Sequence, residues 1–195
     1  MLALPRGGVP VGYEIAIALA LPLDVVVVRK VGAPGDPEYG LGAVTEGGEL
    51  FLDEPRVRQM GLRRSDLDAV ILREKEEAVR RSVLYRGARP PMPVEGKVVV
   101  LVDDGVATGG TLIAAARLLR RRNPRRLVIA TGVSPPETAR RLRREADDVE
   151  CLLIPEEFFS VGSFYRSFEP VEDNEVIELL DAAAGGRSTR TPVTP

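Results

Sequence analysis

The sequence predicts an α/β fold in which helices flank a mostly parallel central sheet. Short runs of β-branched residues alternate with amphipathic stretches along most of the 195 residues, as in consecutive βαβ units. Four consecutive valines, Val25 to Val28, are typical of a strand that is covered on both faces. The length is that of one domain with its own apolar core. These observations together predict a single α/β domain.

The chain is expected to begin with a strand, a glycine-rich turn and a helix. Residues 1–4 form the predicted strand, and Pro5-Arg6-Gly7-Gly8 forms the turn. Apolar residues at helical spacing then continue to residue 19, and the second strand is predicted over residues 23–28.

A less regular segment follows the second strand. Residues 32–40 are rich in glycine and proline and are predicted to form a loop, and Gly47-Gly48 indicates a hairpin. A long helix is predicted over residues 65–85, because Ser65 and Asp68 resemble a capping box at its start.

The second half repeats the strand-helix pattern more regularly. Its predicted elements are, in order, a strand over 98–102, a loop over 103–110, a helix over 111–122, a strand over 127–131, a helix over 136–146 and a strand over 149–154. We expect one domain over residues 1–183, with a hairpin and helix insertion or lid at about 33–93. A small C-terminal hood is expected at about 155–175, and residues 184–195 are predicted to be disordered.

Composition excludes several kinds of chemistry. The chain has no histidine and a single cysteine, so it cannot form a Ser-His-Asp triad, a histidine zinc site or an internal disulfide framework. No signal peptide or membrane span is predicted, and a cytoplasmic location is expected. The net charge of −2 argues against a dedicated nucleic-acid binder.

Ten arginines nevertheless lie between Arg117 and Arg144. The favoured interpretation is that they decorate solvated helix faces. The alternative is a surface for RNA or an acidic partner, as a regulatory protein would need.

The loop after the strand at 98–102 carries the strongest chemical signal. In an open α/β sheet ligands bind beyond the carboxyl ends of the strands, and here Asp103 and Asp104 are followed by small residues that open into a helix. The backbone of Ala107, Thr108, Gly109, Gly110 and Thr111 can approach an oxyanion at the helix N-terminus. The two carboxylates can accept hydrogen bonds from the hydroxyls of a sugar. The combination predicts a site for a sugar 5′-phosphate.

The segment Leu101-Val-Asp-Asp-Gly-Val-Ala-Thr-Gly-Gly-Thr111 resembles the phosphoribosyl-pyrophosphate (PRPP) signature of type I phosphoribosyltransferases. Leu4-Pro-Arg-Gly-Gly8 resembles the pyrophosphate loop of that family, and Val28-Arg-Lys-Val31 resembles its Arg-Lys pair. The resemblance implies a phosphoribosyltransferase fold and the transfer of 5-phosphoribosyl from PRPP to a nitrogen base, with release of pyrophosphate. It also implies Mg²⁺, and a homodimer is expected.

The resemblance implies a role for each matching residue. The residues expected to bind PRPP are Arg6, Gly7, Gly8, Asp103, Asp104, Ala107, Thr108, Gly109, Gly110 and Thr111. Those expected to be catalytic are Asp104, Arg29, Lys30 and Glu38. Mg²⁺ is expected on the pyrophosphate and ribose oxygens, with Asp103 and Asp104 holding it indirectly through PRPP. Because the chain has no histidine, the proton of the base is expected to go to Asp104, to Glu38 or to the substrate itself.

The acceptor site is predicted in the hood. Four of the nine Phe and Tyr residues lie between Phe158 and Tyr165, and aromatic faces suit planar bases. Phe159 and Tyr165 are the candidates for binding the base, and a purine is expected. The alternative is that these rings pack the hood against the sheet.

Two alternatives to the transferase stay open. The first is a regulator that binds PRPP or a nucleotide without transferring it, and that also binds RNA or a protein. The second is another phosphosugar enzyme, which is disfavoured because no ATP-binding segment is visible.

Overall fold

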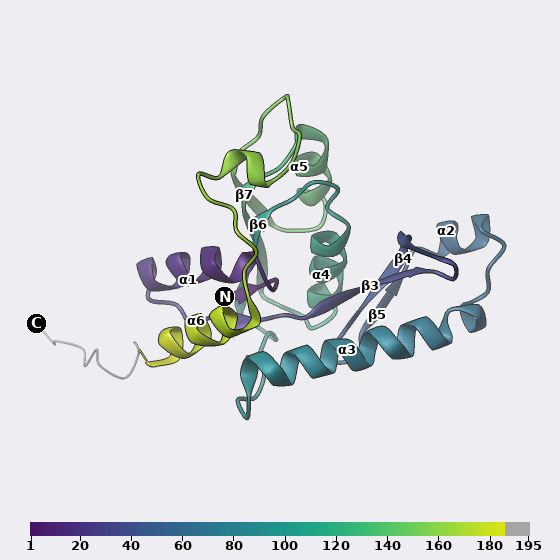
Figure 1. Cartoon of the computed structure of the whole chain (residues 1–195), viewed down its shortest axis with the longest axis horizontal. Helices are drawn as coiled ribbons and strands as arrows, with labels where there is room; N and C mark the ends of the chain where they lie inside the picture. The colour runs from purple at the N-terminus through teal and green to yellow at the C-terminus, as the bar shows by residue number, and fades with distance from the viewer. Residues whose placement is uncertain (186–195) are drawn as a thin grey trace, which may run out of the picture.

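A parallel five-stranded sheet forms the centre of the computed structural model, which describes residues 1–185 apart from the side chain of Glu38 (Figure 1). The strand order is β2-β1-β6-β7-β8, and every neighbouring pair is parallel. The strands are β1 (Leu2–Ala3), β2 (Asp24–Val25), β6 (Val98–Gly105), β7 (Arg126–Val133) and β8 (Asp148–Leu153). The predicted fold class is confirmed.

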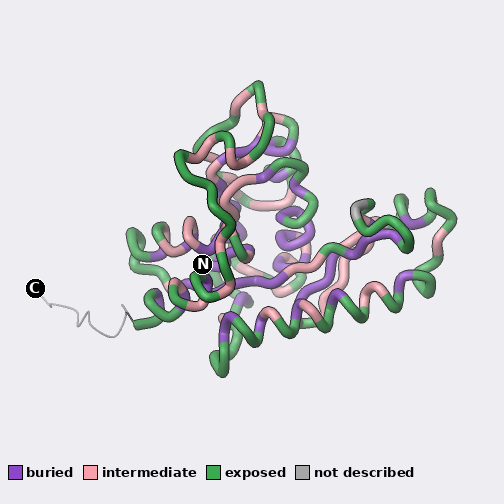
Figure 2. Tube along the Cα trace, viewed as in Figure 1, coloured by how far each residue is buried: buried purple, intermediate pink, exposed green. Residues whose placement is uncertain are grey.

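Helices cover both faces of this sheet, and each face has its own apolar core. On one face α4 (Gly110–Arg120) packs Leu112 and Leu119 against Leu101 and Ile129 of the strands. On the other face α1 (Gly8–Ala18) and α6 (Asp173–Gly185) pack against the alternate strand residues, such as Val102. Adjacent residues of β6 thus point to opposite cores, which is why the strand is apolar throughout. Figure 2 shows that burial is concentrated in the sheet and the inward helix faces.

A second, antiparallel sheet forms an arm that projects from the core (Figure 1). Its strands are β3 (Val28–Ala33), β4 (Asp36–Thr45) and β5 (Leu50–Leu52), followed by α2 (Glu54–Gln59), a 3₁₀ turn (Arg64–Asp66) and the long helix α3 (Asp68–Arg86). The predicted hairpin at Gly47-Gly48 is confirmed as the β4–β5 turn.

The prediction of a loop over residues 32–40 was wrong. This segment is the turn end of the β3–β4 hairpin, and its pairing register shifts on both sides of Gly32. Irregular pairing of this kind accommodates glycine and proline, which normally indicate a loop. The predicted capping box was also displaced, because Asp66 and not Asp68 accepts the backbone N–H, that of Arg63, at 2.8 Å.

Other boundaries moved as well. The predicted strand over 23–28 divides between the two sheets, because β2 ends at Val25 and β3 begins at Val28. The helix predicted over 136–146 is α5 (Pro136–Leu142). Helix α6 was not predicted, and it includes residues 184 and 185 of the segment expected to be disordered. Residues 186–195 lie outside the described part of the chain.

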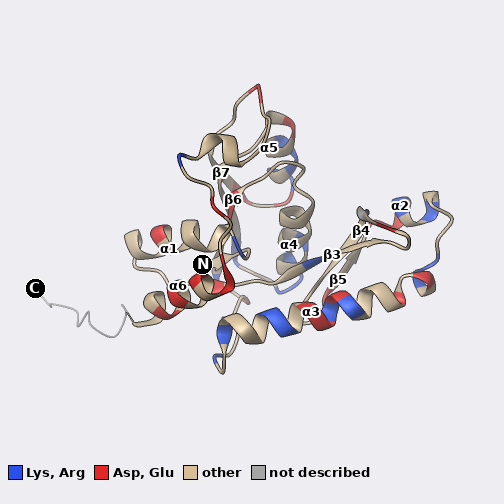
Figure 3. Cartoon of the chain, viewed as in Figure 1, with Lys and Arg blue, Asp and Glu red and all other residues tan. Residues whose placement is uncertain are grey.

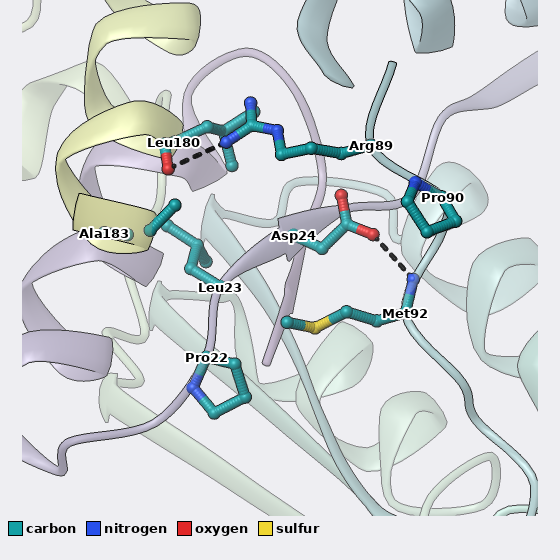
Figure 4. Close-up of a pocket in the computed structure, with 9 residues that line it drawn as sticks. Pro22, Leu23, Asp24, Arg89, Pro90, Met92, Leu180 and Ala183 are labelled. Atoms are coloured by element: carbon teal, nitrogen blue, oxygen red, sulfur yellow. Dashed lines mark hydrogen bonds between the residues drawn. The ribbon is translucent and has the colours of Figure 1, made fainter. Parts of the chain in front are cut away.

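A buried ion cluster joins the arm to the core. Arg86 at the end of α3 donates from Nε to Asp24 Oδ1 of β2 at 2.8 Å and lies 3.0 Å from Glu46 Oε1 in the β4–β5 turn. The other oxygen of Asp24 accepts the backbone N–H of Met92 at 3.0 Å, at the edge of a cavity of about 140 Å³ (Figure 4). Asp24 therefore ties together β2, α3 and the connector that follows α3.

Helix α4 holds the arm from the other side, using arginines of the 117–144 cluster. Arg122 Nε donates to Glu49 at 2.7 Å, Arg121 donates to the carbonyl of Leu50 at 2.8 Å, and the guanidinium of Arg117 lies 4.7 Å from the centre of the Phe51 ring. Arg117 also forms an ion pair with Glu145, and two other members of the cluster form ion pairs, Arg120 with Asp147 and Arg126 with Asp148. Figure 3 shows acidic and basic residues interspersed in this region. Much of the arginine cluster is thus paired internally.

Candidate functional site

Asp103 and Asp104 lie at the carboxyl end of β6, near the middle of the parallel sheet. The strand continues through Gly105, so both acids have extended backbone and not the loop conformation that was predicted. Withdrawal from solvent, together with the adjacent charge of Asp104, raises the pKa of Asp103 well above its usual value. Two carboxylates crowded in this way can accept hydrogen bonds from hydroxyls or share a cation.

The loop after these acids exposes the N-terminus of α4. Gly109 takes a left-handed conformation with φ of +79° immediately before the helix, and no side chain caps the first turn. The carbonyl of Ala107 accepts the hydroxyl of Thr138 at 2.7 Å. The carbonyl of Thr108 accepts a guanidinium N–H of Arg141 at 3.1 Å. The loop carbonyls are thus bonded to α5, and the uncapped N–H groups of α4 are left without a side-chain partner beside Thr108 and Thr111, an arrangement that suits an anion.

The loop formed by Pro5, Arg6, Gly7 and Gly8 lies beside these acids. A Cβ on Gly8 would be 2.7 Å from the carbonyl oxygen of Val102, and one on Gly7 would collide with the carboxylate of Asp104. Position 8 therefore requires glycine, because the backbone of β6 is in the way, whereas a side chain at position 7 would displace the Asp104 carboxylate. Arg6 faces two carboxylates, with its Nη1 3.6 Å from Glu172 and 3.8 Å from Asp173.

The two residues of the predicted Arg29-Lys30 pair make different contacts. Arg29 turns toward α3, where its Nη2 lies 2.9 Å from Oε2 of the buried Glu74. Both residues line a cavity of about 290 Å³ beside α3, but only Lys30 also lines the cavity on which Thr108 and Thr111 open. Adjacent strand residues point to opposite faces, so the structure brings Lys30, and not Arg29, toward the signature loop. The side chain of Glu38 lies outside the described part of the chain.

In the hood, which follows β8, Tyr165 lies at the site and Phe159 does not. The hydroxyl of Tyr165 donates to the backbone carbonyl of Asp104 at 2.6 Å, and its ring packs against Phe168 with 5.2 Å between centroids. Phe159 is 87% exposed, while Phe158 and Phe164 stack on each other. Sequence reasoning missed Phe168. It lies only three residues after Tyr165 in the same aromatic segment, and this proximity could have identified it as a candidate.

Two cavities flank the signature loop. The hood cavity, of about 630 Å³, is lined by Arg6, Gly7, Asp104, Tyr165 and Phe168 together with Glu169 and Glu175. The arm cavity, of about 670 Å³, lies between α4 and the arm and is lined by Lys30, Thr108, Gly110 and Thr111 together with Arg56, Arg117 and Arg141. The predicted pyrophosphate loop and the predicted phosphate loop thus open on different cavities, and Asp104 lines the one on which the pyrophosphate loop opens.

The acids at this edge fit a magnesium ion that is bound mainly through its substrate. Within the described residues, no three acidic, histidine or cysteine side chains converge to form a metal cage. Mg²⁺ commonly takes only one or two carboxylates and obtains its remaining ligands from phosphates and water. Asp103 and Asp104 supply two such groups.

Comparison with known proteins identifies the family. Residues 1–167 match the model of the phosphoribosyl transferase domain, which covers most of the chain. The chain belongs to the phosphoribosyl transferase domain family. None of the described helices has the length and apolar character needed to cross a membrane.

Relatives within this family agree with the fold. Two proteins of Mycobacterium tuberculosis, from strains CDC 1551 / Oshkosh and ATCC 25618 / H37Rv, are provisionally named phosphoribosyl transferases and are 42% identical over 94% of this chain. The chain spans 41% of the length of these two relatives. The crystal structure of TT1426 from Thermus thermophilus is 45% identical, covers 92% of this chain with 85% of its own, and superposes with a TM-score of 0.82. The phosphoribosyl transferase fold is therefore shared along nearly the whole chain.

Proposed function

We propose that this chain transfers 5-phosphoribosyl from PRPP to a nitrogen base and releases pyrophosphate. The observation that supports this most strongly is the convergence, at one edge of the sheet, of the Gly7-Gly8 loop, the Asp103-Asp104 pair and the uncapped N-terminus of α4. These three features match the leaving group, the ribose hydroxyls and the 5′-phosphate of PRPP. Family membership supports the same assignment.

In the proposed reaction the C1′–O bond to pyrophosphate breaks while a bond from the base nitrogen to C1′ forms. Pyrophosphate leaves with the bonding electrons, and the base loses the proton of its N–H group. The backbone of Gly7 and Gly8 and the cations of Arg6 and Lys30 would hold the leaving group, where negative charge accumulates. Arg6 would exchange Glu172 and Asp173 for pyrophosphate oxygens.

Magnesium belongs to this proposal. When it is bound, Mg²⁺ supplies neutralisation of charge on the pyrophosphate and ribose oxygens. Asp103 and Asp104 would hold it through PRPP. Burial and the adjacent charge of Asp104 raise the pKa of Asp103, and a cation or hydroxyl donors bound beside it would favour its ionised form.

The hood cavity would hold the acceptor base. Tyr165 and Phe168 present aromatic faces there, and Asp104 lines the same cavity and is the proposed acceptor of the base proton. A purine is the proposed base because a two-ring face uses both aromatic side chains. A cytoplasmic location completes the proposal and follows the sequence, which has a lone cysteine.

Release of pyrophosphate tests the function directly. The chain is incubated with Mg²⁺ and PRPP and with adenine, guanine, hypoxanthine, uracil or orotate, and pyrophosphate is measured. We expect release that depends on both the base and Mg²⁺ and is fastest with a purine. Binding of PRPP without release for any acceptor would instead identify a regulator, and fastest release with uracil would contradict the purine assignment.

A homodimer is also proposed, through the outer face of α3. Leu72, Val79 and Val83 are 57%, 41% and 61% exposed and recur at spacings of seven and four residues, so they form one apolar stripe on the helix. Paired antiparallel about a twofold axis, two such stripes would place Leu72 opposite Val83 of the partner helix.

Changing this stripe is expected to convert the dimer to a monomer. The double variant Val79→Glu with Val83→Glu should halve the mass measured by light scattering after gel filtration. Leu152→Glu, on the exposed side of β8, is the matched control and should leave the mass unchanged. A monomeric wild-type chain, or dissociation by the Leu152 variant alone, would contradict this interface.

A further inference from the structure

The arm cavity is strongly cationic. Among the described residues that line it, Lys30, Arg56, Arg117 and Arg141 carry positive charge, and Asp53 is the one carboxylate. The exposed phosphate-loop residues Thr108, Gly110 and Thr111 also open on it. A cavity in which cations outnumber carboxylates and which meets a helix N-terminus is suited to a phosphate.

The four cations differ in the contacts that they already make. Arg117 forms a two-pronged bond with Glu145 and lies over the Phe51 ring, so it serves to hold α4, the arm and the end of α5 together. Lys30 already belongs to the proposed pyrophosphate contacts. Arg56 and Arg141 are the two cations of this cavity to which the proposed reaction assigns no role.

Arg141 comes from the core side of the cavity. It lies on α5, and its Nη1 donates to the carbonyl oxygen of Thr108 at 3.1 Å. A guanidinium has five N–H donors in a planar fork, so one group can bond this carbonyl and an anion together. Its position places a positive charge beside the phosphate loop.

Arg56 comes from the arm side. It lies on α2, its Nε is 3.2 Å from Oδ2 of Asp53, and its Nη1 is 3.5 Å from the carbonyl of Gly40. Its side chain is 53% exposed, so this ion pair is weak and can exchange for a stronger anion.

We infer that Arg56 and Arg141 bind the 5′-phosphate of PRPP together with the N-terminus of α4, one from the arm and one from α5. This inference rests on the proposed function. It assigns these arginines to the phosphomonoester because Thr108, Gly110 and Thr111 of the phosphate loop open on the same cavity, whereas Arg6 and Gly7 of the pyrophosphate loop open on the other one. A phosphate held in this way would bridge the arm and the core, so the chain would discriminate against an unphosphorylated ribose.

Calorimetric titration with two partial ligands tests the inference. Ribose 5-phosphate reports on the 5′-phosphate site, and magnesium pyrophosphate reports on the leaving-group site. We expect Arg56→Gln and Arg141→Gln each to weaken binding of ribose 5-phosphate and of PRPP by about tenfold, the loss of one charge-assisted hydrogen bond. Binding of magnesium pyrophosphate should change by less than about twofold.

Two control variants distinguish the loss of a phosphate contact from a general change in the charge or packing of α2 and α5. Arg58→Gln on α2 and Arg140→Gln on α5 remove the same charge from the same helices at positions that do not line the cavity, and both should bind ribose 5-phosphate like the wild type. Arg56 makes no bond to the phosphate loop, so its variant cannot act by displacing that loop, whereas the Arg141 variant could.

Three outcomes would overturn the inference. In the first, Arg56→Gln and Arg141→Gln both bind PRPP as the wild type does, while the wild type still releases pyrophosphate. In the second, the two variants lose affinity for magnesium pyrophosphate instead. In the third, the Arg58 and Arg140 controls lose as much affinity for ribose 5-phosphate as the variants. A wild-type chain that binds PRPP but releases no pyrophosphate would overturn the transfer reaction and leave the phosphate contacts to be judged by the binding data.

Discussion

Replacing Asp103 and Asp104 together by asparagine is expected to lower the affinity for PRPP by about a hundredfold or more. Each carboxylate is assigned to hydroxyl groups of the ribose, and a hydrogen bond to a charged group contributes about 1.5–3 kcal/mol. The double change also removes the negative charge that would attract magnesium to bound PRPP. Calorimetric titration with Mg²⁺ and PRPP measures the loss.

The matched control is the pair Glu156→Gln with Glu157→Gln. These two carboxylates are also adjacent in the chain, but they are exposed and line neither cavity, so PRPP affinity should stay within about twofold of the wild type. Equal affinity in the Asp103 and Asp104 double variant and the wild type would refute the assignment of these acids to the ribose.

Asp103 should also reduce the stability of the folded chain at neutral pH. The pKa of Asp103 is raised in the folded chain, so between its unfolded and folded pKa values the folded state binds more protons than the unfolded state. The free energy of unfolding must then fall as the pH rises through this window. Asp103→Asn removes this dependence. Urea unfolding between pH 4 and pH 8 should show the wild type losing stability relative to the variant as the pH rises.

Replacing Arg86 by alanine is expected to lower the free energy of unfolding by about 3–5 kcal/mol, the usual loss when one partner of a buried ion cluster is removed. The guanidinium is buried among Asp24, Glu46, Ser82 and the carbonyl of Val25. Without it, two carboxylates of low exposure face each other across the junction of the arm and the core. Within the described residues Glu46 Oε2 already has no hydrogen-bond partner. No other donor of the cluster is therefore available to replace the guanidinium of Arg86.

Arg80→Ala on the same helix is the control. Arg80 bonds Glu77 at the surface, and such a pair contributes about 0–1 kcal/mol, so its loss should be small. Equilibrium urea unfolding of both variants gives the comparison. Equal losses in the two variants would show that the buried cluster does not hold the arm to the core.

Local patterns were sufficient to predict the parallel sheet of this molecule. The valine-rich strands, the alternation of strands with helices and the loop after Asp104 each depend on residues that are close together in the chain, and the parallel sheet and the uncapped α4 follow from them. The register of the arm was not predictable in the same way. Glycine and proline within residues 32–40 indicated a loop, because the sequence does not reveal that a bulged hairpin would accept them.

The positions of the charged side chains also depended on contacts between distant segments. Arg29 and Lys30 are adjacent cations that the sequence does not distinguish. In the structure Arg29 forms an ion pair with the buried Glu74 of α3, whereas Lys30 lines the cavity beside α4. For the arginine cluster the sequence favoured solvated helix faces and left a partner surface as the alternative, and the structure pairs several of its members with Glu49, Glu145, Asp147 and Asp148.

The sequence by itself determined the fold class, the family resemblance and the loops that carry the candidate chemistry, because each is encoded in short contiguous segments. Only the tertiary structure decided that these loops open on two cavities, that Tyr165 and not Phe159 lies at the acids, and that Arg56 and Arg141 lie near the phosphate loop. The physical reason is that these residues come from segments far apart in the chain. Their proximity depends on how the arm, α4, α5 and the hood pack around the carboxyl end of β6.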